Sequence, residues 1–308
     1  MPLKIFTKII LTQNSLEDPI DMTKKTNRGN YFEDFYIGQY IEHATPRTIT
    51  SGDVALYMSL YGSRFPIESS HTFAKNVGYK NSPIDDLLTF HIVFGKTVPD
   101  ISLNAIANLG YAEGRFHQPV YPNDTLFSSS EVIGLKENSN GESGIVYIRS
   151  SGKNQNNVLV LDFIRWVMVR KKDKVNATKT SEVPQFSEKA DLSTIKLPIR
   201  VNFEKYNYSE AGSRYQWNDY IVGEKIDHLD GMTIEEAEHM MATRLYQNNA
   251  KVHFNQHIEQ TNRFGRRLIY GGHIISLARA LSFNGLANAC RIIGINSGRH
   301  VAPVFAQD

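Results

Sequence analysis

Apolar runs in the first half of the chain predict a group of strands. The segments 125–135, 144–151 and 158–169 are rich in β-branched and aromatic side chains, among them Tyr147 and Trp166. This composition is typical of strands, in which such side chains pack well on a pleated surface. Because the three segments follow one another closely, we expect consecutive antiparallel strands.

Longer segments with a different pattern predict helices. Helical stretches are expected at 51–61 and 233–246, and longer apolar helices at 86–97 and 272–289. In the last of these, apolar side chains occur nearly all round, as expected of a helix that a sheet encloses. Thr233 is expected to cap its helix, because acidic residues follow it in the first turn.

The sequence contains an internal duplication. Residues 32–43 (FEDFYIGQYIEH) correspond to 217–228 (WNDYIVGEKIDH), an offset of 185 (217 − 32). Residues 114–124 (GRFHQPVYPND) correspond to 298–308 (GRHVAPVFAQD), an offset of 184 (298 − 114). Two blocks in the same order at nearly the same spacing indicate a repeat, and we call the halves copy one and copy two.

Each copy is therefore expected to contain a strand, a helix, a loop and a long central helix, in that order. In copy one, the strands predicted at 125–135, 144–151 and 158–169 follow. A sheet wrapped around one buried helix is an α+β architecture. We expect an extension outside the fold at 1–29, copy one at 30–171, a linker at 172–213 and copy two at 214–308. The linker contains a segment rich in Lys, Ser, Thr and Pro.

Asp308, the last residue of the sequence, is the equivalent of Asp124 in copy one. In copy one, the three predicted strands follow that position. A sheet without these strands would expose an edge and leave its central helix partly uncovered. We expect either a truncated product, which is the simpler account, or another chain that completes the sheet.

Composition narrows the function classes. The 308 residues are 41% hydrophobic and 21% charged, with a formal net charge of +2, which argues against a nucleic-acid or membrane-surface binder. Cys290 is the single cysteine, so an internal disulfide and a Cys-based metal site are excluded, and a reducing compartment such as the cytoplasm is expected. No apolar run reaches the roughly 18 residues of a membrane span.

The loop before the central helix of copy two carries the candidate chemistry. His253 lies between apolar residues after a polar cluster at 247–249, and Gly271 and Gly272 stand at the start of the helix. Glycines at a helix N-terminus let a ligand approach free amides, which can hold an oxyanion. A histidine beside such amides is suited to proton transfer next to a thioester carbonyl.

These residues resemble the motif of the MaoC-like, R-specific enoyl-CoA hydratases, approximately Gly-Asp-x-Asn-Pro-apolar-His followed by a glycine at the helix start. Longer stretches resemble the mesaconyl-CoA hydratase (2-methylfumaryl-CoA hydratase) group over residues of about 29–308. They are GNYFEDFYIGQ (29–39), ATPRTIT (44–50), GDVALY (52–57), YGSRFPIESS (61–70), PIDDLLTFHIVFGKTVPDISLNAIANLGYAEGRF (83–116) and TRLYQNNAKVHFNQH (243–257). The resemblance implies a double hotdog fold, with the second repeat apparently truncated.

The resemblance also assigns roles to residues of copy two. His253 falls on the motif histidine, Asn248 on its aspartate, Ala250 on its asparagine and Gly272 on the glycine whose amide would hold the thioester oxygen. Asparagine cannot accept a proton at neutral pH and can only position a water, so the general two-residue mechanism is in doubt.

Copy one departs further from the motif. Ser63, Phe65 and Glu68 stand at the Asp, Asn and His positions, and Leu87 replaces the glycine. Copy one is therefore expected to be catalytically degenerate and to serve as substrate wall and sheet partner.

The implied activity is reversible hydration of mesaconyl-CoA to β-methylmalyl-CoA, with no cofactor and a CoA thioester as the partner molecule. A homodimer is a possible assembly, and a partner nucleic acid or membrane is not expected. The second carboxylate of the substrate needs a cation, for which a bidentate arginine is the natural choice. The sequence does not rank the candidates Arg244, Arg263, Arg266, Arg267 and Arg299.

Several alternatives stay open. Asp85 and Asp86 are interpreted first as a helix cap, and second as substrate-contacting acids that reach into the cleft. A metal site is weakly supported, because His253 and His257 are four residues apart without the glutamate of an HExxH pattern. A hotdog acyl-CoA thioesterase and an inactive acyl-CoA-binding protein are the competing functions.

Overall fold

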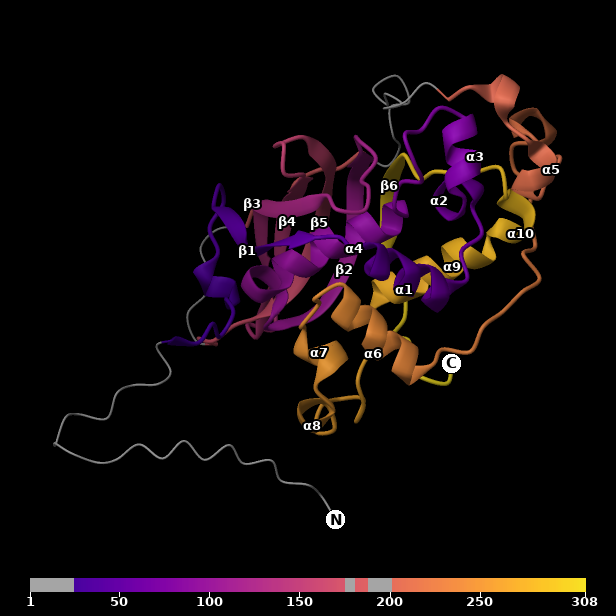
Figure 1. Cartoon of the computed structure of the whole chain (residues 1–308). Coiled ribbons are helices and arrows are strands. Elements are labelled where there is room, and N and C mark those ends of the chain that lie inside the picture. The colour runs from indigo at the N-terminus through magenta and orange to yellow at the C-terminus, as the bar shows by residue number, and fades with distance from the viewer. Residues whose placement is uncertain (1–24, 175–180, 188–200) are drawn as a thin grey trace, which may run out of the picture.

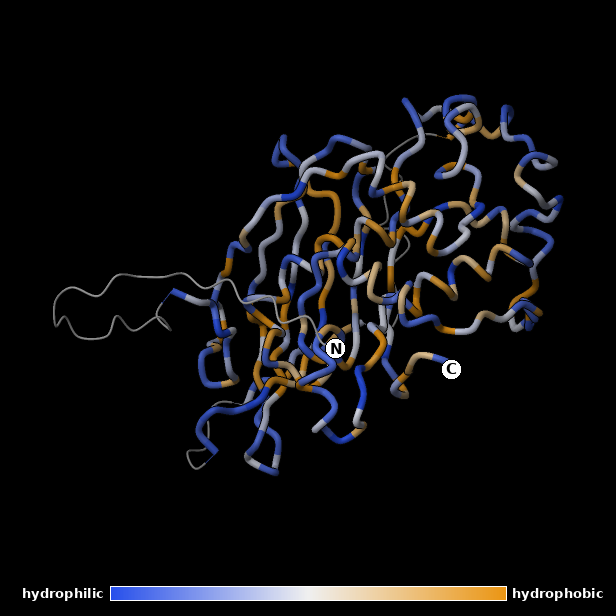
Figure 2. Tube along the Cα trace, turned by 60° about the horizontal axis from the view of Figure 1, so that its bottom comes forward, coloured by the Kyte–Doolittle hydropathy of each residue, from blue (hydrophilic) through white to orange (hydrophobic). Residues whose placement is uncertain are grey.

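The computed structural model describes residues 25–174, 181–187 and 201–308. One side of the molecule is a sheet with α4 along its face, and the other side is a group of helices that includes α1, α6 and α9 (Figure 1). Apolar stretches lie mostly in the inner strands and helices, whereas the outer loops are mostly hydrophilic (Figure 2). The expected α+β architecture is confirmed.

The sheet has six antiparallel strands in the order β1-β3-β4-β5-β2-β6. Copy one supplies five of them and copy two supplies β6. The three strands expected at 125–135, 144–151 and 158–169 are confirmed as β3, β4 and β5. The bounds are β1 Tyr40–Thr48, β2 Ala105–Phe116, β3 Thr125–Glu137, β4 Ser143–Lys153, β5 Leu159–Arg170 and β6 Gly294–Arg299.

The pairing of β2 with β6 joins the two copies about a pseudo-twofold axis. Gly110 pairs with Arg299, and Arg115 pairs with Gly294. Adding the repeat offset of 184 to positions 110 and 115 gives positions 294 and 299, so the two pairs are equivalents of each other. An isologous contact of this kind is what a symmetric dimer forms. The two copies thus meet as an intramolecular pseudo-dimer.

Two side-chain contacts lie on the same axis. The Tyr61 hydroxyl lies 2.7 Å from the Tyr246 hydroxyl, and the partners are 185 residues apart. His91 Nε2 lies 2.8 Å from Ser276 Oγ, again across 185 residues. The first pair retains identical side chains, whereas the second has diverged into two unlike polar groups.

Helix α4 (Asp86–Thr97) has the predicted bounds and is the central helix of copy one. Asp85 caps it by accepting a hydrogen bond from the Leu87 amide at 2.8 Å, as the first interpretation of this residue expected. All twelve residues of α4 are buried. The helix contacts β1, β3, β4 and β5 with one side, so its other side faces copy two, where the Tyr246 backbone lies against Gly95.

The central helix of copy two is shorter than predicted. It is α9 (Gly271–Leu281), followed by the kinked α10 (Phe283–Leu286), in which Gly285 has a φ of 111° that an uninterrupted helix does not allow. The buried residues of α9 are Gly272, His273, Ser276 and Leu277. The expectation of a helix enclosed by a sheet is therefore wrong for the described residues, in which α9 contacts α1 and α10.

The repeated block 217–228 does not form a second β1. In copy one, η2 (Phe32–Asp34) leads into β1, and Phe32 is 1% exposed. In copy two, η6 (Trp217–Asp219) leads into an irregular segment, and Trp217 is 90% exposed. In copy one, β1 pairs with β3, whereas no described strand pairs with residues 217–228.

The other helices are short apart from α1 and α6. Helix α1 has the predicted bounds, but α6 begins later than predicted, with Glu235 rather than Thr233 at the N-cap. The bounds of these helices, with α1 and α6 included, are α1 Ser51–Tyr61, α2 Pro66–Ser69, α3 His71–Asn76, η3 Val98–Ser102, η5 Phe203–Lys205, α5 Tyr208–Ala211, α6 Glu236–Leu245, α7 Lys251–Phe254 and α8 Gln256–Glu259.

The predicted extension and linker are only partly described. Residues 1–24, 175–180 and 188–200 lie outside the described part of the chain. Within the expected linker, Ala211 is buried in a cluster with Ile67, Phe73 and Cys290. Cys290 lies beyond α10. The boundaries of the copies stay predictions.

We predict that Gly95→Ala destabilises the protein, because its Cβ would collide with the backbone oxygen of Tyr246 across the axis. Overpacking of this kind costs about 1–3 kcal/mol. Gly52→Ala is the matched control, since a Cβ there would meet only Thr50 Oγ1 at an ordinary 3.5 Å. Chemical denaturation of both variants measures the difference, and equal stabilities would contradict the close approach of the copies.

Candidate active site

The site is formed where the α6–α7 loop of copy two meets the N-terminus of α9. Tyr270 is the N-cap of α9, and its amide donates to His239 Nε2 at 2.9 Å. The ring of His253, on α7, lies 5.5 Å from the Tyr270 ring and 6.1 Å from the His239 ring, measured between centroids. The structure thus brings the predicted histidine beside the predicted helix start.

His253 is held with one ring nitrogen free. Its Nδ1 donates to the Leu268 carbonyl at 2.9 Å, so Nδ1 carries the proton of the neutral ring. No protein partner of Nε2 occurs among the described residues, and the side chain is only half-buried. Burial lowers the pKa of His253 to about 4, with a smaller effect of His300 in the same direction. At neutral pH, Nε2 is therefore an unprotonated acceptor.

Gly271 and Gly272 are the first two residues of α9, and neither amide donates to an acceptor in the described chain. Free amides at this position combine with the helix dipole to favour an anion. The two glycines are also required by packing. A Cβ at Gly272 would collide with the Tyr270 and His91 rings, and one at Gly271 with the His300 ring. These rings therefore occupy the space that a side chain would need.

Neutral aromatic and imidazole rings fill the space behind the helix start. His273 Nδ1 lies 2.8 Å from the Tyr61 hydroxyl, and its Nε2 has no partner among the described residues. Burial lowers the pKa of His91 and His239 to about 3 and that of His273 to about 4. The cluster is thus uncharged at neutral pH. No group of His, Cys, Asp and Glu in the described residues is arranged to hold a metal ion.

Asn248 is 2% exposed and forms part of the wall of a cavity. Its Oδ1 accepts from the Ala250 amide at 3.1 Å, while Nδ2 has no partner among the described residues. The preceding Gln247 adopts a φ of 53°, a left-handed conformation that is uncommon for a residue other than glycine. This turn sets the direction in which Asn248 leaves the end of α6.

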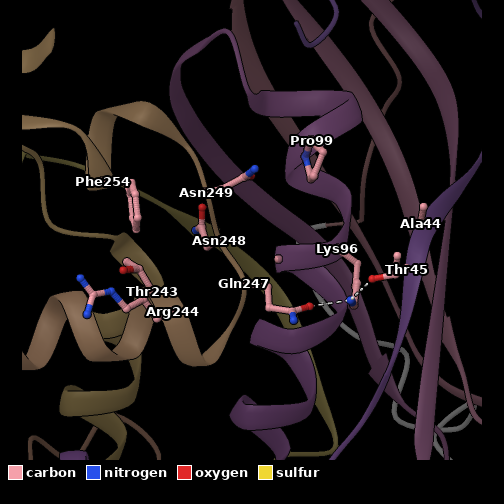
Figure 3. Close-up of a pocket in the computed structure, with 11 residues that line it drawn as sticks. Ala44, Thr45, Lys96, Pro99, Thr243, Arg244, Gln247, Asn248, Asn249 and Phe254 are labelled. Carbon is pink, nitrogen blue, oxygen red and sulfur yellow. Dashed lines mark hydrogen bonds between the residues drawn. The ribbon is translucent and has the colours of Figure 1, made fainter. Parts of the chain in front are cut away.

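The cavity has a volume of about 410 Å³ and lies between the two copies (Figure 3). Its walls contain two cationic and no acidic side chains. Lys96 of α4 is one of the cations, and it donates to Gln247 Oε1 at 2.6 Å (Figure 3). The lining residues are Ala44, Thr45, Gly95, Lys96, Pro99, Thr243, Arg244, Gln247, Asn248, Asn249 and Phe254.

Only one of the candidate arginines reaches this cavity. Arg244 lines it, but its guanidinium is turned away from Lys96 (Figure 3). The other arginines have different surroundings: Arg267 pairs with Glu236, Arg266 and Arg263 lie over Phe305 and Phe264, and Arg299 is an exposed residue of β6.

Five residues near the helix start were not identified from the sequence: His91, His239, Tyr270, His273 and His300. Tyr270 directly precedes the Gly-Gly pair, and that position was the available signal. His300 follows the repeated Gly-Arg of 298–299, but the repeat has a phenylalanine at the equivalent position of copy one, so the pattern did not mark it as functional. His239 lies in an amphipathic helix, and no sequence motif includes it.

With the geometry established, comparison with known proteins gives the family. A family model described as mesaconyl-CoA hydratase matches residues 12–285. The chain belongs to the mesaconyl-CoA hydratase family. It is 63% identical to the β-methylmalyl-CoA dehydratase of Chloroflexus aurantiacus, over 93% of this chain and 82% of that one. It is 55% identical to the mesaconyl-CoA hydratase of Cereibacter sphaeroides, over 92% and 82% of the two chains.

Solved structures agree with the sequence comparison. A MaoC domain dehydratase from Chloroflexus aurantiacus superposes with a TM-score of 0.90 and 63% identity, over 92% of this chain and 81% of that one. A Mycobacterium tuberculosis protein with a double hotdog fold superposes at 0.70 with 24% identity, over 91% and 84%. The expected double hotdog fold is confirmed, and this member of the mesaconyl-CoA hydratase family is a hydro-lyase. None of the described helices is long and apolar enough to span a membrane.

The equivalent site in copy one is occupied by an ion-pair cluster. Glu68, at the histidine position, lies 3.5 Å from Arg291 of copy two, and Asp86, at the position of Gly271, accepts from Arg291 Nε at 2.7 Å. Burial raises the pKa of Glu68 well above its ordinary value, and Arg291 opposes this shift. Burial, with the charge of Asp86, raises the pKa of the capping Asp85 to about 6. Asp85 thus caps α4, and Asp86 binds Arg291.

We predict that Arg291→Met destabilises this hydratase by about 3–5 kcal/mol, because two carboxyl groups would remain buried without their cation. Arg299→Met, at an exposed position, is the control and should leave stability almost unchanged. Urea denaturation measures both, and a loss at position 291 no larger than at 299 would refute a structural role for the cluster.

Proposed function

We propose that this enzyme reversibly hydrates mesaconyl-CoA to β-methylmalyl-CoA. The observation that carries the proposal is the free Nε2 of a neutral His253 beside a helix start with two free amides. A base and an oxyanion site are the groups that hydration of an enoyl thioester requires. The names of the two relatives, one for each direction of the same reaction, support the choice of substrate.

In the hydration direction, His253 Nε2 takes a proton from water as the water oxygen bonds to the β-carbon of the enoyl group. The π electrons move toward the thioester, and negative charge develops on its oxygen. The amides of Gly271 and Gly272 stabilise that charge, with the dipole of α9 adding to their effect. The protonated ring then returns a proton to the α-carbon, so atoms and charge balance. Dehydration follows the same path in reverse.

The neutral state of His253 fits this role. Its Nδ1–H remains on the Leu268 carbonyl, so the ring keeps one orientation throughout. Asn248, which replaces an acid, supplies a hydrogen-bond donor and no proton, so the proton transfers fall on His253 alone. The rings of His91, His239 and His273 are also neutral at neutral pH, so the region behind the helix start carries no charge from them.

We predict that His253→Ala lowers kcat/KM for mesaconyl-CoA by about 100- to 10,000-fold, because general base catalysis is lost. Loss of the enoyl-thioester absorbance measures hydration, and thiol release measured in parallel separates it from hydrolysis. His257→Ala, an exposed histidine on α8, is the control and should retain activity. Thiol release without loss of the double bond would favour a thioesterase instead.

The pH dependence tests the protonation state. Because the pKa of His253 is lowered to about 4, the base stays unprotonated well below neutrality. We expect kcat/KM to be level between about pH 8 and pH 5 and to fall as the pH drops through about 4. Initial rates, with circular dichroism at each pH to confirm the folded state, measure the profile. A fall centred near the ordinary histidine value of about 6.5 would contradict the assignment.

A further inference from the structure

Lys96 is a buried cation that has no acidic partner in the described chain. It is 4% exposed, at the C-terminal end of α4, and donates only to two neutral oxygens, Gln247 Oε1 at 2.6 Å and Thr45 Oγ1 at 3.4 Å. Buried charges in proteins are normally paired, because removal from water is costly. Nearby Arg47, in contrast, pairs with Asp53 at 2.7 Å. An anion other than the acidic side chains of the described residues is therefore needed beside Lys96.

The surroundings of Lys96 have the character of an anion site. It lines the cavity of about 410 Å³ between the copies, whose walls contain no acidic side chain. Burial, followed by the charge of Arg47, lowers the pKa of Lys96. A bound anion would reverse this shift, because a nearby negative charge favours the charged form of an amine.

A second unused donor belongs to a residue in the wall of the same cavity. Asn248 is 2% exposed, and its Nδ2 has no acceptor among the described residues, since Oδ1 already accepts from Ala250. Lys96 comes from copy one and Asn248 from copy two, and they are linked through Gln247, which bonds to Lys96 and directly precedes Asn248. Unsatisfied buried donors are costly unless a ligand completes them.

We propose that Lys96 binds the free carboxylate of the acyl group, so that the enzyme selects enoyl-CoA thioesters that end in a second carboxylate. This inference rests on the proposed function, since it places the acyl group of that reaction in the cavity beside Asn248. In mesaconyl-CoA the second carboxylate is attached to the carbon that receives water. A cation that holds it therefore also fixes the position of the reacting carbon. The arginines considered from the sequence are not needed for this contact.

The test compares two substrates that differ only at the proposed contact. Mesaconyl-CoA carries the carboxylate, and 2-methylcrotonyl-CoA carries a methyl group in its place. Lys96→Met should lower kcat/KM for mesaconyl-CoA on the order of 100-fold, because a charged group loses its partner, and should leave 2-methylcrotonyl-CoA unchanged or improved. Lys75→Met, an exposed lysine on α3, is the matched control and should change neither.

An equal loss for both substrates would overturn the proposal, because it would mean that Lys96 holds Gln247 in place or binds the phosphates of CoA, which both substrates carry. No loss for either would overturn it as well.

A binding measurement separates this inference from the proposed function. Succinyl-CoA and butyryl-CoA are not hydrated, and they differ by one carboxylate. The unmodified enzyme should bind succinyl-CoA at least tenfold more tightly in calorimetry, and Lys96→Met should remove that preference. If the unmodified enzyme failed to hydrate mesaconyl-CoA but showed this preference, only the proposed function would fail. If it showed no preference, the carboxylate site would be refuted whatever the activity.

Discussion

The antiparallel pairing of β2 with β6 is the contact on which the arrangement of the two copies depends. Its register relates equivalent residues of the copies, and so it brings the starts and loops of the two central helices face to face across one axis. Tyr61 meets Tyr246 there, and His91 meets Ser276. In a symmetric dimer each such position must suit both subunits with one side chain. Duplication within a single chain removes that restriction, so the two sides of the axis can diverge.

The divergence is greatest at the two motif positions. In copy two, an imidazole keeps one nitrogen free beside a glycine-rich helix start. In copy one, Glu68 stands at the histidine position and Asp86 at the position of Gly271, and both lie against Arg291 of copy two. A buried carboxylate pair without a cation would be unstable, so loss of the copy-one site is coupled to a residue on the other copy. The same sheet thus supports one site that is open to a ligand and one that is closed by an ion pair.

Local patterns predicted several elements of the structure, although Glu235 and not Thr233 is the N-cap of α6. The bounds of α1 and α4 follow from caps and apolar periodicity, and copy one was expected to act as a sheet partner, for which the structure gives the register. Prediction failed where a distant partner decides. Residues 217–228 repeat the sequence of β1, but a strand also requires a neighbour with which to pair. The helix predicted at 272–289 ends at 281, because Gly285 adopts a conformation that only the surrounding chain determines.

Lys96 shows the same limit at the candidate site. In the sequence it is one lysine near the end of an apolar helix, where a charged residue ordinarily reaches solvent. It is buried because the α6–α7 loop of copy two covers it, and this loop carries Asn248 and leads into α7, which carries His253. Whether a cation can bind the substrate depends on its surroundings, which the sequence does not give. Arg267 pairs with Glu236, and Arg263 and Arg266 lie over aromatic rings. The contact between the copies that forms the cavity wall also buries Lys96, which has no carboxylate partner among the described residues. Packing of the two copies against each other therefore also creates the need for an anionic ligand.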